Sequence, residues 1–439
     1  MSLVNKIYGR IIIPSMYYLR GDLRFKYFNQ YKRNLEKSKK EIQQYQLSRL
    51  KKLLIHSYKT VPYYTELFDR INFKPEKIKS VKDLKKIPLL DKSTLLQNLD
   101  NLKSRKRYHL KECTSGGSTG NRVVIFKDKR YNEISKAIFM RDFFSVGIEP
   151  GEKIAWIWSS PIDNDKLKKY FLHRLLWHLN RRILFNSLNY TDLEMENWLK
   201  KDLMSFKPDY LYGYPNVIYE MAKLIQKKKI IIPKIKKIIC SAQTLEHREF
   251  IEKIFNCKVI NQYGSREILS IAIEYNNYVM HSSDDFVIVE IGKNNEIILT
   301  PLESYGMPLI RYVIGDQGIK KKSKITDTYP FQQFNIQIGR ISELLNSHTG
   351  EKISSGKINM QIADQKLNIG EFQLIQKSLQ DIEIKIVKDT NSNQNDIEKL
   401  KSIIRNVLGI SDIKITLVEK FPLEKNGKKI GYKNLIENK

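Results

Sequence analysis

The first 110 residues carry a helical pattern of apolar and polar positions. In YKRNLEKSKKEIQQYQLSRLKKLLIHSY, residues 31–58, apolar side chains recur at intervals of three and four between charged ones, which predicts an amphipathic helix. Pro62 in KTVPYY ends that pattern, and a second proline-containing turn, KKIPLLDKSTL, follows at residues 85–95. We therefore expect a mainly helical region over residues 1–110.

Short apolar runs alternate with helical ones between about residues 121 and 320. The amphipathic stretch NVIYEMAKLIQKKK, residues 216–229, is typical of the helices between them. The runs that predict strands are RVVIF, KIAWIWSS, DYLYGY, IKKIICSA, KVINQYG, DFVIVEI and NEIILTPL. This alternation predicts an α/β fold with a largely parallel sheet.

The pattern changes after residue 338. FQLIQ, IEIKIVK and IKITLVEK predict strands, and NDIEKLKSIIRNVLG predicts a helix between the last two. Together they describe a small α+β unit. We place a domain boundary near Gly339, which gives a large domain over residues 1–338 and a small one over residues 339–439.

The composition is strongly basic and adds candidate partners. The chain has 77 Lys and Arg against 48 Asp and Glu, a formal charge of +29, which attracts nucleic acid, anionic lipid or phosphorylated substrates. The lysines are spread along the chain together with many Ile and Asn residues, the bias of an AT-rich coding sequence. No recognised nucleic-acid-binding motif stands out. We therefore expect no nucleic-acid partner.

The cysteines and the hydropathy of the chain indicate the cellular compartment to expect. Cys113, Cys240 and Cys257 lie far apart, without the close pairs of a zinc site or the even count of a disulfide framework. No stretch approaches the ~20 apolar residues of a transmembrane helix, and the N-terminus lacks the long apolar region of a signal peptide. We expect reduced cysteines and a cytoplasmic protein.

The segment TSGGSTGNRVVIFK, residues 114–127, concentrates glycine and hydroxyl side chains. Glycines permit tight turns that expose backbone N–H groups, and the hydroxyls add donors, so the segment suits an anion such as a triphosphate. The GxxxxGK[ST] pattern of the common P-loop is missing. An ordinary flexible turn uses the same residues, so the segment alone leaves both alternatives open.

Five segments in order carry a resemblance to a known superfamily. Residues 114–120 resemble the phosphate-binding loop of the adenylate-forming superfamily, whose members join a carboxylate to AMP. The other four are NQYGSREI (261–268), similar to its aromatic-glycine-x-x-glutamate motif, MPLIRYVIGDQG (307–318), similar to the segment ending in a ribose-binding aspartate, IGRISE (338–343), similar to the interdomain hinge, and PLEKNGK (422–428), similar to the C-terminal PxxxxGK motif.

Short sequence segments narrow the resemblance from the superfamily to one family. HSYKTVPYYTELF, KPDYLYGYPNVIYEMA and YGSRE resemble the phenylacetate-CoA ligase family and the CapK-type proteins encoded with capsular polysaccharide genes. The resemblance covers roughly residues 45–435. It implies a large N-terminal α/β domain of the acyl-adenylate-forming type and a small, mobile α+β C-terminal domain.

The resemblance also implies roles for residues that bind the nucleotide. Hydroxyl and backbone N–H groups of the glycine-rich loop would hold the β- and γ-phosphates of ATP. The loop residues are Thr114, Ser115, Gly116, Gly117, Ser118, Thr119 and Gly120. Asp316 would accept hydrogen bonds from both ribose hydroxyls, and Arg340, near the hinge, would contact ribose or phosphate.

The YGSRE motif would bind the nucleotide and a metal ion. Tyr263 would stack on adenine, Gly264 would give the backbone room, and Ser265 would belong to the same segment. Glu267 is the expected Mg²⁺ ligand, because a hard cation prefers carboxylate oxygen. Arg266 replaces the threonine usual in much of the superfamily and would meet the phosphate or a distinct acyl substrate.

Two residues are predicted to be catalytic, Glu267 and Lys428. An ammonium at Lys428 would reach the bond between the carboxylate and the α-phosphate and stabilise the charge that develops there. Three departures from the common pattern leave an inactive protein with this fold as an alternative: Arg122 where proline is frequent, Gln243 where glutamate is frequent, and Ser342 where Asp or Lys is frequent.

Two runs are both basic and amphipathic, KIYGRIIIPSMYYLR (6–20) and KLKKYFLHRLLWHLNRRILF (166–185). We read each as helical. Such helices either face the core or lie on the inner face of an anionic membrane. His173 and His178 lie on the second run, where a zinc or catalytic role competes with a partly buried helix face.

The function implied by the resemblance is an AMP-forming ligase. ATP and a small carboxylic acid would give an acyl-adenylate, and the acyl group would pass to coenzyme A or to a sugar or amine, in capsular or surface polysaccharide biosynthesis. Alternatives are an aryl-acid CoA ligase of catabolism, an inactive scaffold with the same fold and a basic nucleic-acid-binding protein.

Overall fold

The computed structural model describes residues 2–114, 124–158, 171–187, 190–245, 247–275, 278–293, 295–320, 329–338, 344–350, 352–354, 372–387, 394–419 and 431–436, with residues 358, 362, 365, 367 and 369. Contacts divide the chain into two compact units. Unit 1 comprises residues 1–314 and 319–335, and unit 2 comprises residues 315–318 and 336–439. The boundary predicted at Gly339 falls outside the described residues.

Helices make up most of the first 110 residues, as the pattern predicted. They are α1 (Leu3–Ile7), a π-helical turn (Tyr8–Ile12), α2 (Ile13–Leu19), α3 (Arg24–Lys32), α4 (Lys39–Thr60), α5 (Pro62–Arg70) and α6 (Lys92–Gln97), with 3₁₀ turns at Arg33–Glu36, Pro75–Lys77 and Val81–Lys86. The single helix expected over residues 31–58 is broken. Ser38 and Glu41 form a capping box that starts α4, and Pro62 at the first turn of α5 ends the run, as expected.

Five parallel strands form one half of the large sheet in unit 1, in the order β4-β3-β5-β6-β7. They are β3 (Ile154–Trp158), β4 (Arg182–Asn186), β5 (Tyr210–Gly213), β6 (Lys237–Ser241) and β7 (Lys258–Tyr263). β4 corrects the sequence analysis, because residues 182–186 belong to a strand and not to the helical run 166–185. The helix α9 (Phe171–Leu179) ends first, and Arg181 with φ of 54° turns the chain into the strand.

The other half of the sheet is antiparallel wherever a register is described. Its strands are β8 (Ala272–Tyr275), β9 (Val279–Ser282), β10 (Val287–Ile291), β11 (Glu296–Pro301), β12 (Tyr312–Lys320) and β13 (Gln333–Ile338). Antiparallel pairing is described for β7 with β8, β8 with β9, β9 with β13 and β10 with β11. The largely parallel sheet that we expected is thus confined to five strands, and the runs at 285–302 form a hairpin.

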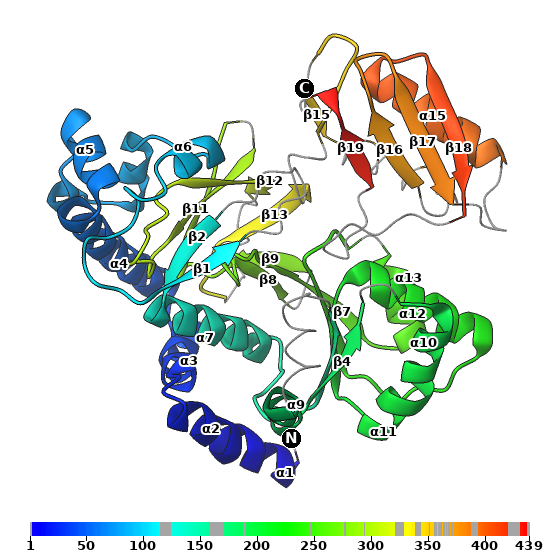
Figure 1. The fold of residues 1–439 in the computed structure, drawn as a ribbon, viewed down its shortest axis with the longest axis horizontal. Helices are drawn as coiled ribbons and strands as arrows, with labels where there is room; N and C mark the ends of the chain where they lie inside the picture. The colour runs from blue at the N-terminus through cyan, green and yellow to red at the C-terminus, as the bar shows by residue number, and fades with distance from the viewer. Residues whose placement is uncertain are drawn as a thin grey trace. The chain divides into compact units, whose positions relative to one another are not determined.

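Helices cover both faces of the parallel strands (Figure 1). One face is covered by α7 (Lys129–Ser145) and α9. The other face is covered by α10 (Asp192–Asn197), α12 (Pro215–Lys228) and α13 (Arg248–Phe255). Between α10 and α12 the chain forms a π-helical turn (Trp198–Leu203) and the short helix α11 (Met204–Phe206). Neighbouring strand residues face opposite cores, as the two-residue period requires. Ile238 packs in the core under α12, whereas Ile239 packs in the core under α7.

A buried carboxylate joins the N-terminal helices to the sheet. Glu303, whose side chain is fully buried, accepts hydrogen bonds from Arg49 of α4, from Arg130 of α7 (2.5 Å) and from the hydroxyl of Tyr31 in α3 (3.2 Å). Removing one partner of a buried ion pair is strongly destabilising because the other charge is left uncompensated. The N-terminal helices are therefore part of unit 1.

Unit 2 contains a four-stranded sheet in the order β18-β17-β16-β19. Its elements are β14 (Leu344–Asn346), β15 (Lys352–Ser354), β16 (Phe372–Gln376), β17 (Ile382–Val387), α15 (Gln394–Leu408), β18 (Ile413–Val418) and β19 (Tyr432–Asn434). α15 contributes its apolar face, including Leu400 and Ile404, to a core with Ile384 of β17. The strands and the helix predicted between residues 372 and 420 are confirmed.

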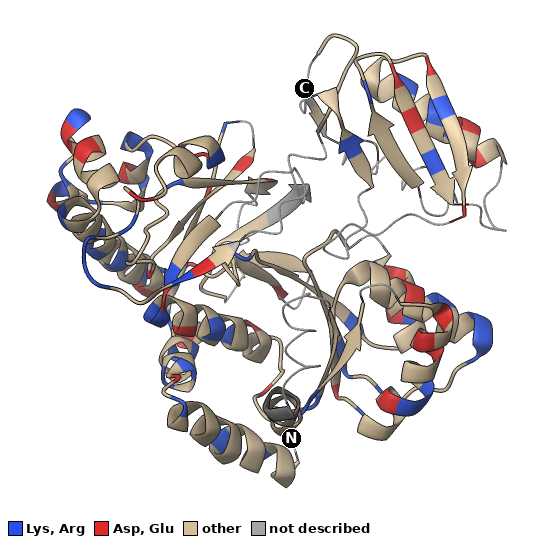
Figure 2. Ribbon diagram, viewed as in Figure 1, with Lys and Arg blue, Asp and Glu red and all other residues tan. Residues whose placement is uncertain are grey.

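Charged residues are interspersed along both units. Figure 2 shows Lys and Arg on helices and strands throughout the described chain, with Asp and Glu between them. None of the described helices has the length and apolarity required to span a membrane.

Candidate active site

The YGSRE motif forms a tight turn at the carboxyl end of β7. The backbone N–H of Ser265 donates to the carbonyl of Ile268 (2.8 Å), and the N–H of Ile268 donates to the hydroxyl of Ser265 (3.1 Å). A Cβ atom at Gly264 would lie 2.1 Å from the carbonyl oxygen of Leu269. Glycine is therefore required at residue 264 for the close approach of two backbone segments.

A buried amide fixes the start of this turn. Gln262 accepts a hydrogen bond from the hydroxyl of Ser241 at the end of β6 (2.6 Å). Its amide nitrogen donates to the carbonyl of Leu269 and to the hydroxyl of Ser270, both at 3.2 Å. The ends of two parallel strands are thereby joined at one edge of the sheet, which is where ligands bind in open α/β folds.

The strands on either side of the glycine-rich loop pair with each other. β1 (Leu110–Thr114) and β2 (Val124–Asp128) are antiparallel, and Thr114 lies opposite Val124. Residues 115–123, including the predicted phosphate ligands Ser115–Gly120 and the departure Arg122, lie outside the described residues. The described strands hold the two ends of the loop next to each other at Thr114 and Val124.

The base of this hairpin lies against the YGSRE turn. Lys127 donates from Nζ to the carbonyl oxygen of Arg266 (2.6 Å), and the thiol of Cys113 donates to the same oxygen (3.4 Å). Arg266 and Glu267 are adjacent in the chain. The structure therefore brings together two of the five segments that the sequence analysis singled out, although they lie about 140 residues apart in sequence.

Lys127 is a functional candidate that the sequence analysis missed. It is 9% exposed, and burial lowers the pKa of its ammonium, an effect that Cys113 and Glu267 partly oppose. A buried ammonium beside a carboxylate contributes positive charge next to the motif. In the sequence, Lys127 was one lysine among many in a strand-like run, and only the hairpin register reveals its position.

Glu267 is buried next to helix α7. The residue is 6% exposed, and its backbone carbonyl accepts a hydrogen bond from the hydroxyl of Tyr131 in α7 (3.1 Å). Mg²⁺ is usually bound through one or two carboxylates together with waters and substrate phosphates. The described residues contain no group of three or more His, Cys, Asp or Glu side chains arranged to hold a metal ion. A single carboxylate such as that of Glu267 is a donor that Mg²⁺ accepts when waters and substrate phosphates complete its coordination.

The structure also describes the surroundings of Tyr263 and Gln243. The ring of Tyr263 is buried and meets the ring of Phe334 edge-on, with 6.4 Å between the centroids. Gln243 follows β6 directly after Ala242, which has φ of 68°. Its amide oxygen is buried without a hydrogen-bond partner among the described residues, so it is available to a donor from a ligand.

Of the remaining predicted residues, the structure describes Asp316 and His178. Asp316 is half-buried in β12 and belongs to the segment that clusters with unit 2. Arg340, Ser342 and Lys428 lie outside the described residues. His178 is exposed on α9.

Comparisons with known proteins agree with this fold. The CapK C-terminal domain family model matches residues 345–438. Protein CapK of Staphylococcus aureus is 27% identical over 386 residues, which are 84% of each chain. Phenylacetate-coenzyme A ligase of Thermus thermophilus is 23% identical over 293 residues, which are 62% of this chain and 64% of the relative.

A solved structure is similar over nearly the whole chain. It is 2-hydroxyisobutyryl-CoA ligase in the postadenylation state, with a TM-score of 0.67, 16% identity and coverage of 90% of this chain and 89% of the other. At this identity the likeness concerns the fold. The chain is therefore a homologue of CapK and of the phenylacetate-coenzyme A ligases, carries a CapK C-terminal domain, and has the fold of the adenylate-forming CoA ligases.

Proposed function

We propose that this protein is an AMP-forming ligase that activates a small carboxylic acid with ATP and transfers the acyl group to an acceptor. The observation that carries the proposal is the contact of Cys113 and Lys127 with the carbonyl of Arg266. It places the base of the glycine-rich hairpin beside the turn that holds Glu267. Homology to ligases of this type supports the same reaction.

The reaction has two balanced steps. A carboxylate oxygen of the acid attacks the α-phosphorus of ATP, the bond from that phosphorus to the bridging oxygen breaks, and pyrophosphate leaves. The acceptor nucleophile then attacks the carbonyl carbon of the acyl-adenylate, loses its proton, and AMP leaves with the former carboxylate oxygen. The protein contributes mainly positioning and charge stabilisation in the first step.

Each predicted residue has one task in this scheme. The loop from Thr114 to Gly120 would hold the β- and γ-phosphates, and Glu267 would hold Mg²⁺, which neutralises charge on the phosphates. Asp316 would bind the ribose, and Arg340 would contact the ribose or a phosphate. Lys428 would contact the oxygen that bridges the acyl group and the α-phosphorus.

Two further residues are assigned to the adenine-binding part of the site. Tyr263 would contact adenine, and the unpartnered amide oxygen of Gln243 would accept a hydrogen bond from an amino group such as that of adenine. Glutamine in place of glutamate keeps an acceptor at this position. The departure at Gln243 is therefore compatible with nucleotide binding.

The identity of the acyl acceptor and the biological role of the reaction are further proposals. Homology to CapK favours capsular or surface polysaccharide biosynthesis, with coenzyme A or a sugar hydroxyl or amine as acceptor. The phenylacetate-coenzyme A ligases favour an aryl acid and coenzyme A. A cytoplasmic setting, with or without contact to the inner face of the membrane, stays a prediction.

The test is exchange of labelled pyrophosphate into ATP across a panel of aryl, fatty, hydroxy and amino acids. We expect at least one acid to promote exchange. Lys428→Ala and Glu267→Gln should each lower the rate by about a hundredfold or more, because they remove charge that acts on the transition state. Lys425→Ala, three residues away, is the matched control. Undiminished exchange in Lys428→Ala would show that its assigned role is wrong.

A further inference from the structure

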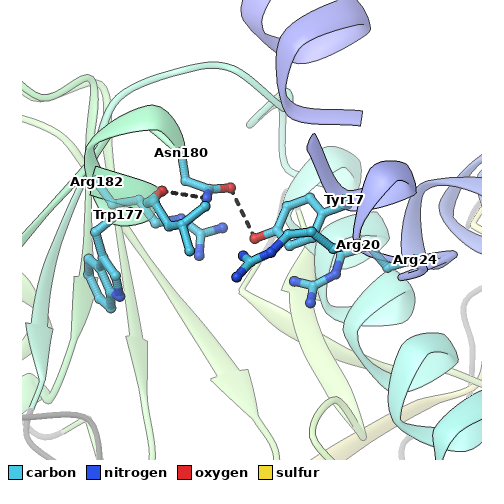
Figure 3. Close-up of a pocket in the computed structure, with 7 residues that line it drawn as sticks. Tyr17, Arg20, Arg24, Trp177, Asn180 and Arg182 are labelled. Atoms are coloured by element: carbon cyan, nitrogen blue, oxygen red, sulfur yellow. Dashed lines mark hydrogen bonds between the residues drawn. The ribbon is translucent and has the colours of Figure 1, made fainter. Parts of the chain in front are cut away.

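A second candidate site lies at the opposite ends of the parallel strands. The pocket has a volume of about 240 Å³ and sits where β4 begins, beside the end of α2 and the start of α3 (Figure 3). Arg182 is the first residue of β4 and lies opposite Ile154, the first residue of β3. Because β4 has five residues, roughly 13 Å of strand separates its first residue, at this pocket, from its carboxyl end.

Basic and aromatic side chains line the pocket from both sides. Those that the argument uses are Tyr17, Arg20, Arg24, Trp177, Asn180 and Arg182. The hydroxyl of Tyr17 donates to Oδ1 of Asn180 (3.0 Å), and Nδ2 of Asn180 donates to the carbonyl of Leu176 (2.6 Å). This chain of hydrogen bonds joins the end of α2 to the end of α9. The pocket thus has a fixed wall, and Figure 3 shows the three guanidinium groups around the space between the two sides.

The positive charge in the pocket exceeds the negative charge. Asp22 forms an ion pair with Arg24 (2.5 Å), whereas Arg20 and Arg182 have no ion pair within the described chain. Arg182 instead lies over the ring of Trp156, with its Cζ atom 5.0 Å from the centroid. Lys136, on α7, is close enough to Arg24 and Asp22 to interact with both.

Helix ends do not cancel this excess. α2 and α9 both end at the pocket, and each helix C-terminus carries roughly half a negative elementary charge. The carbonyls there already accept hydrogen bonds from Arg20 N, Gly21 N, Asn180 N and Arg181 N. After Asp22 and both helix ends are counted, about one positive charge remains. Lys136 and the buried Glu133 on α7 add one charge of each sign nearby.

Two pKa shifts agree with the charge count. Burial and the neighbouring Arg24 together lower the pKa of Lys136 to about 8, although Asp22 and Glu133 act in the opposite direction. Burial also lowers the pKa of Arg182, with Arg24 acting in the same direction. Both directions indicate cations that lack a sufficient counter-charge within the chain.

We propose that this pocket binds a phosphate group carried by a small ligand. Guanidinium groups match phosphate oxygens in bidentate geometry, Tyr17 and Asn180 add polar contacts, and the volume admits a phosphomonoester with a small substituent. The proposal does not depend on the ligase reaction, which belongs to the other ends of the strands.

The phosphate has two sources, a soluble phosphomonoester or a lipid headgroup. Leu19 and Tyr18, at the end of α2, are 84% and 72% exposed, and Leu3, Val4, Ile7 and Ile11 are exposed on α1 and the turn after it. These apolar side chains next to basic ones suit the surface of an anionic bilayer. The experiment distinguishes the two sources.

The first arm measures binding of glycerol 3-phosphate and inorganic phosphate to the full chain by calorimetry and tryptophan fluorescence, since Trp177 lines the pocket. We expect saturable binding that weakens about tenfold or more in Arg182→Gln and in Arg20→Gln, because each loses a charge-assisted hydrogen bond. Arg33→Gln, an exposed arginine at the end of α3, should bind as the native protein does. ATP affinity should be unchanged in all three, which separates this pocket from the candidate active site.

The second arm measures co-sedimentation with phosphatidylcholine vesicles that contain or lack phosphatidic acid. If the source is a lipid headgroup, native protein binds the acidic vesicles, and both Arg182→Gln and Leu19→Ser bind them less. If the source is soluble, glycerol 3-phosphate binds and the vesicles do not. Both results support the phosphate site. No saturable binding in either arm, or equal binding by native protein and by folded Arg182→Gln and Arg20→Gln, would overturn it.

Discussion

The two ends of the parallel strands differ in how far their polar and charged groups are paired within the chain. At the carboxyl ends, the polar groups of the YGSRE turn are bonded within the chain: Gln262 holds the carbonyl of Leu269, and Lys127 holds the carbonyl of Arg266. At the amino ends, Arg20 and Arg182 have no acidic partner among the described residues. The first end is arranged by its own contacts, whereas the second carries charge that a partner from outside the chain would neutralise.

This difference fits the two proposed sites. A site that positions a nucleotide needs a backbone fixed before the ligand arrives, because small displacements of reacting groups are costly. A site that binds a phosphate needs uncompensated cations, since every internal carboxylate competes with the ligand. The two arrangements therefore predict different responses to the loss of one lysine at each end.

The largest effect is expected at the carboxyl end from Lys127→Met. Without the ammonium, the carbonyl of Arg266 loses its shorter hydrogen bond and the turn that carries Glu267 is released. We expect pyrophosphate exchange to fall about tenfold to a hundredfold, and the Mg²⁺ concentration for half-maximal exchange to rise. The measurement is exchange as a function of Mg²⁺, with an acid that supports the native reaction.

Lys111→Met is the matched control for this lysine. Lys111 lies directly across the hairpin from Lys127 but is exposed, so its loss should leave exchange within about twofold, as for most surface substitutions. Lys127→Arg retains a donor and should recover part of the rate. Equal exchange in Lys127→Met and Lys111→Met would contradict the positioning role.

Much of the fold followed from residue patterns, and the exceptions have physical causes. The strands at 153–160 and 258–264 and the helix at 216–229 were predicted because apolar periodicity reports burial directly. β4 was missed because the apolar and basic residues of 182–185 continue the pattern of α9, and only the positive φ of Arg181 separates them.

The candidate site was predictable only in its motifs. YGSRE could be singled out because its residues are contiguous, but the contact with Lys127 depends on the hairpin register and on packing between distant segments. The arginine pocket was not predicted, although most of its lining residues lie in the two basic amphipathic runs 6–20 and 166–185, because the sequence does not show that these runs meet. Its lining residues come from α2, α3, α9 and β4, and in the sequence each arginine is one of 77 basic residues.

A smaller effect is expected at the amino end from Lys136→Met, on stability. In the folded protein the pKa of Lys136 is about 8, below the unfolded value of about 10.4. The folded state therefore binds fewer protons between these values, so native stability rises with pH from about 8 to 10.4 and stays at its lower level below pH 8. We expect Lys136→Met to be more stable at pH 7 by about 1–2 kcal/mol.

Urea unfolding of native protein and Lys136→Met at pH 7, 8, 9 and 10 measures this difference. It should shrink steadily as pH rises, because the native lysine loses its charge. Lys26→Met, an exposed lysine on α3, should show no such trend. A difference that stays constant with pH would mean that the amino end is not short of negative charge at Lys136.

The central claim is that the carboxyl end activates a carboxylate by adenylation, and oxygen transfer tests it most directly. A complete turnover is run with ATP, the acceptor and an acid labelled with ¹⁸O in both carboxylate oxygens. Adenylation predicts AMP and pyrophosphate as products, with one ¹⁸O atom in the AMP. Formation of ADP, or AMP without label while the acid is consumed, would contradict the account.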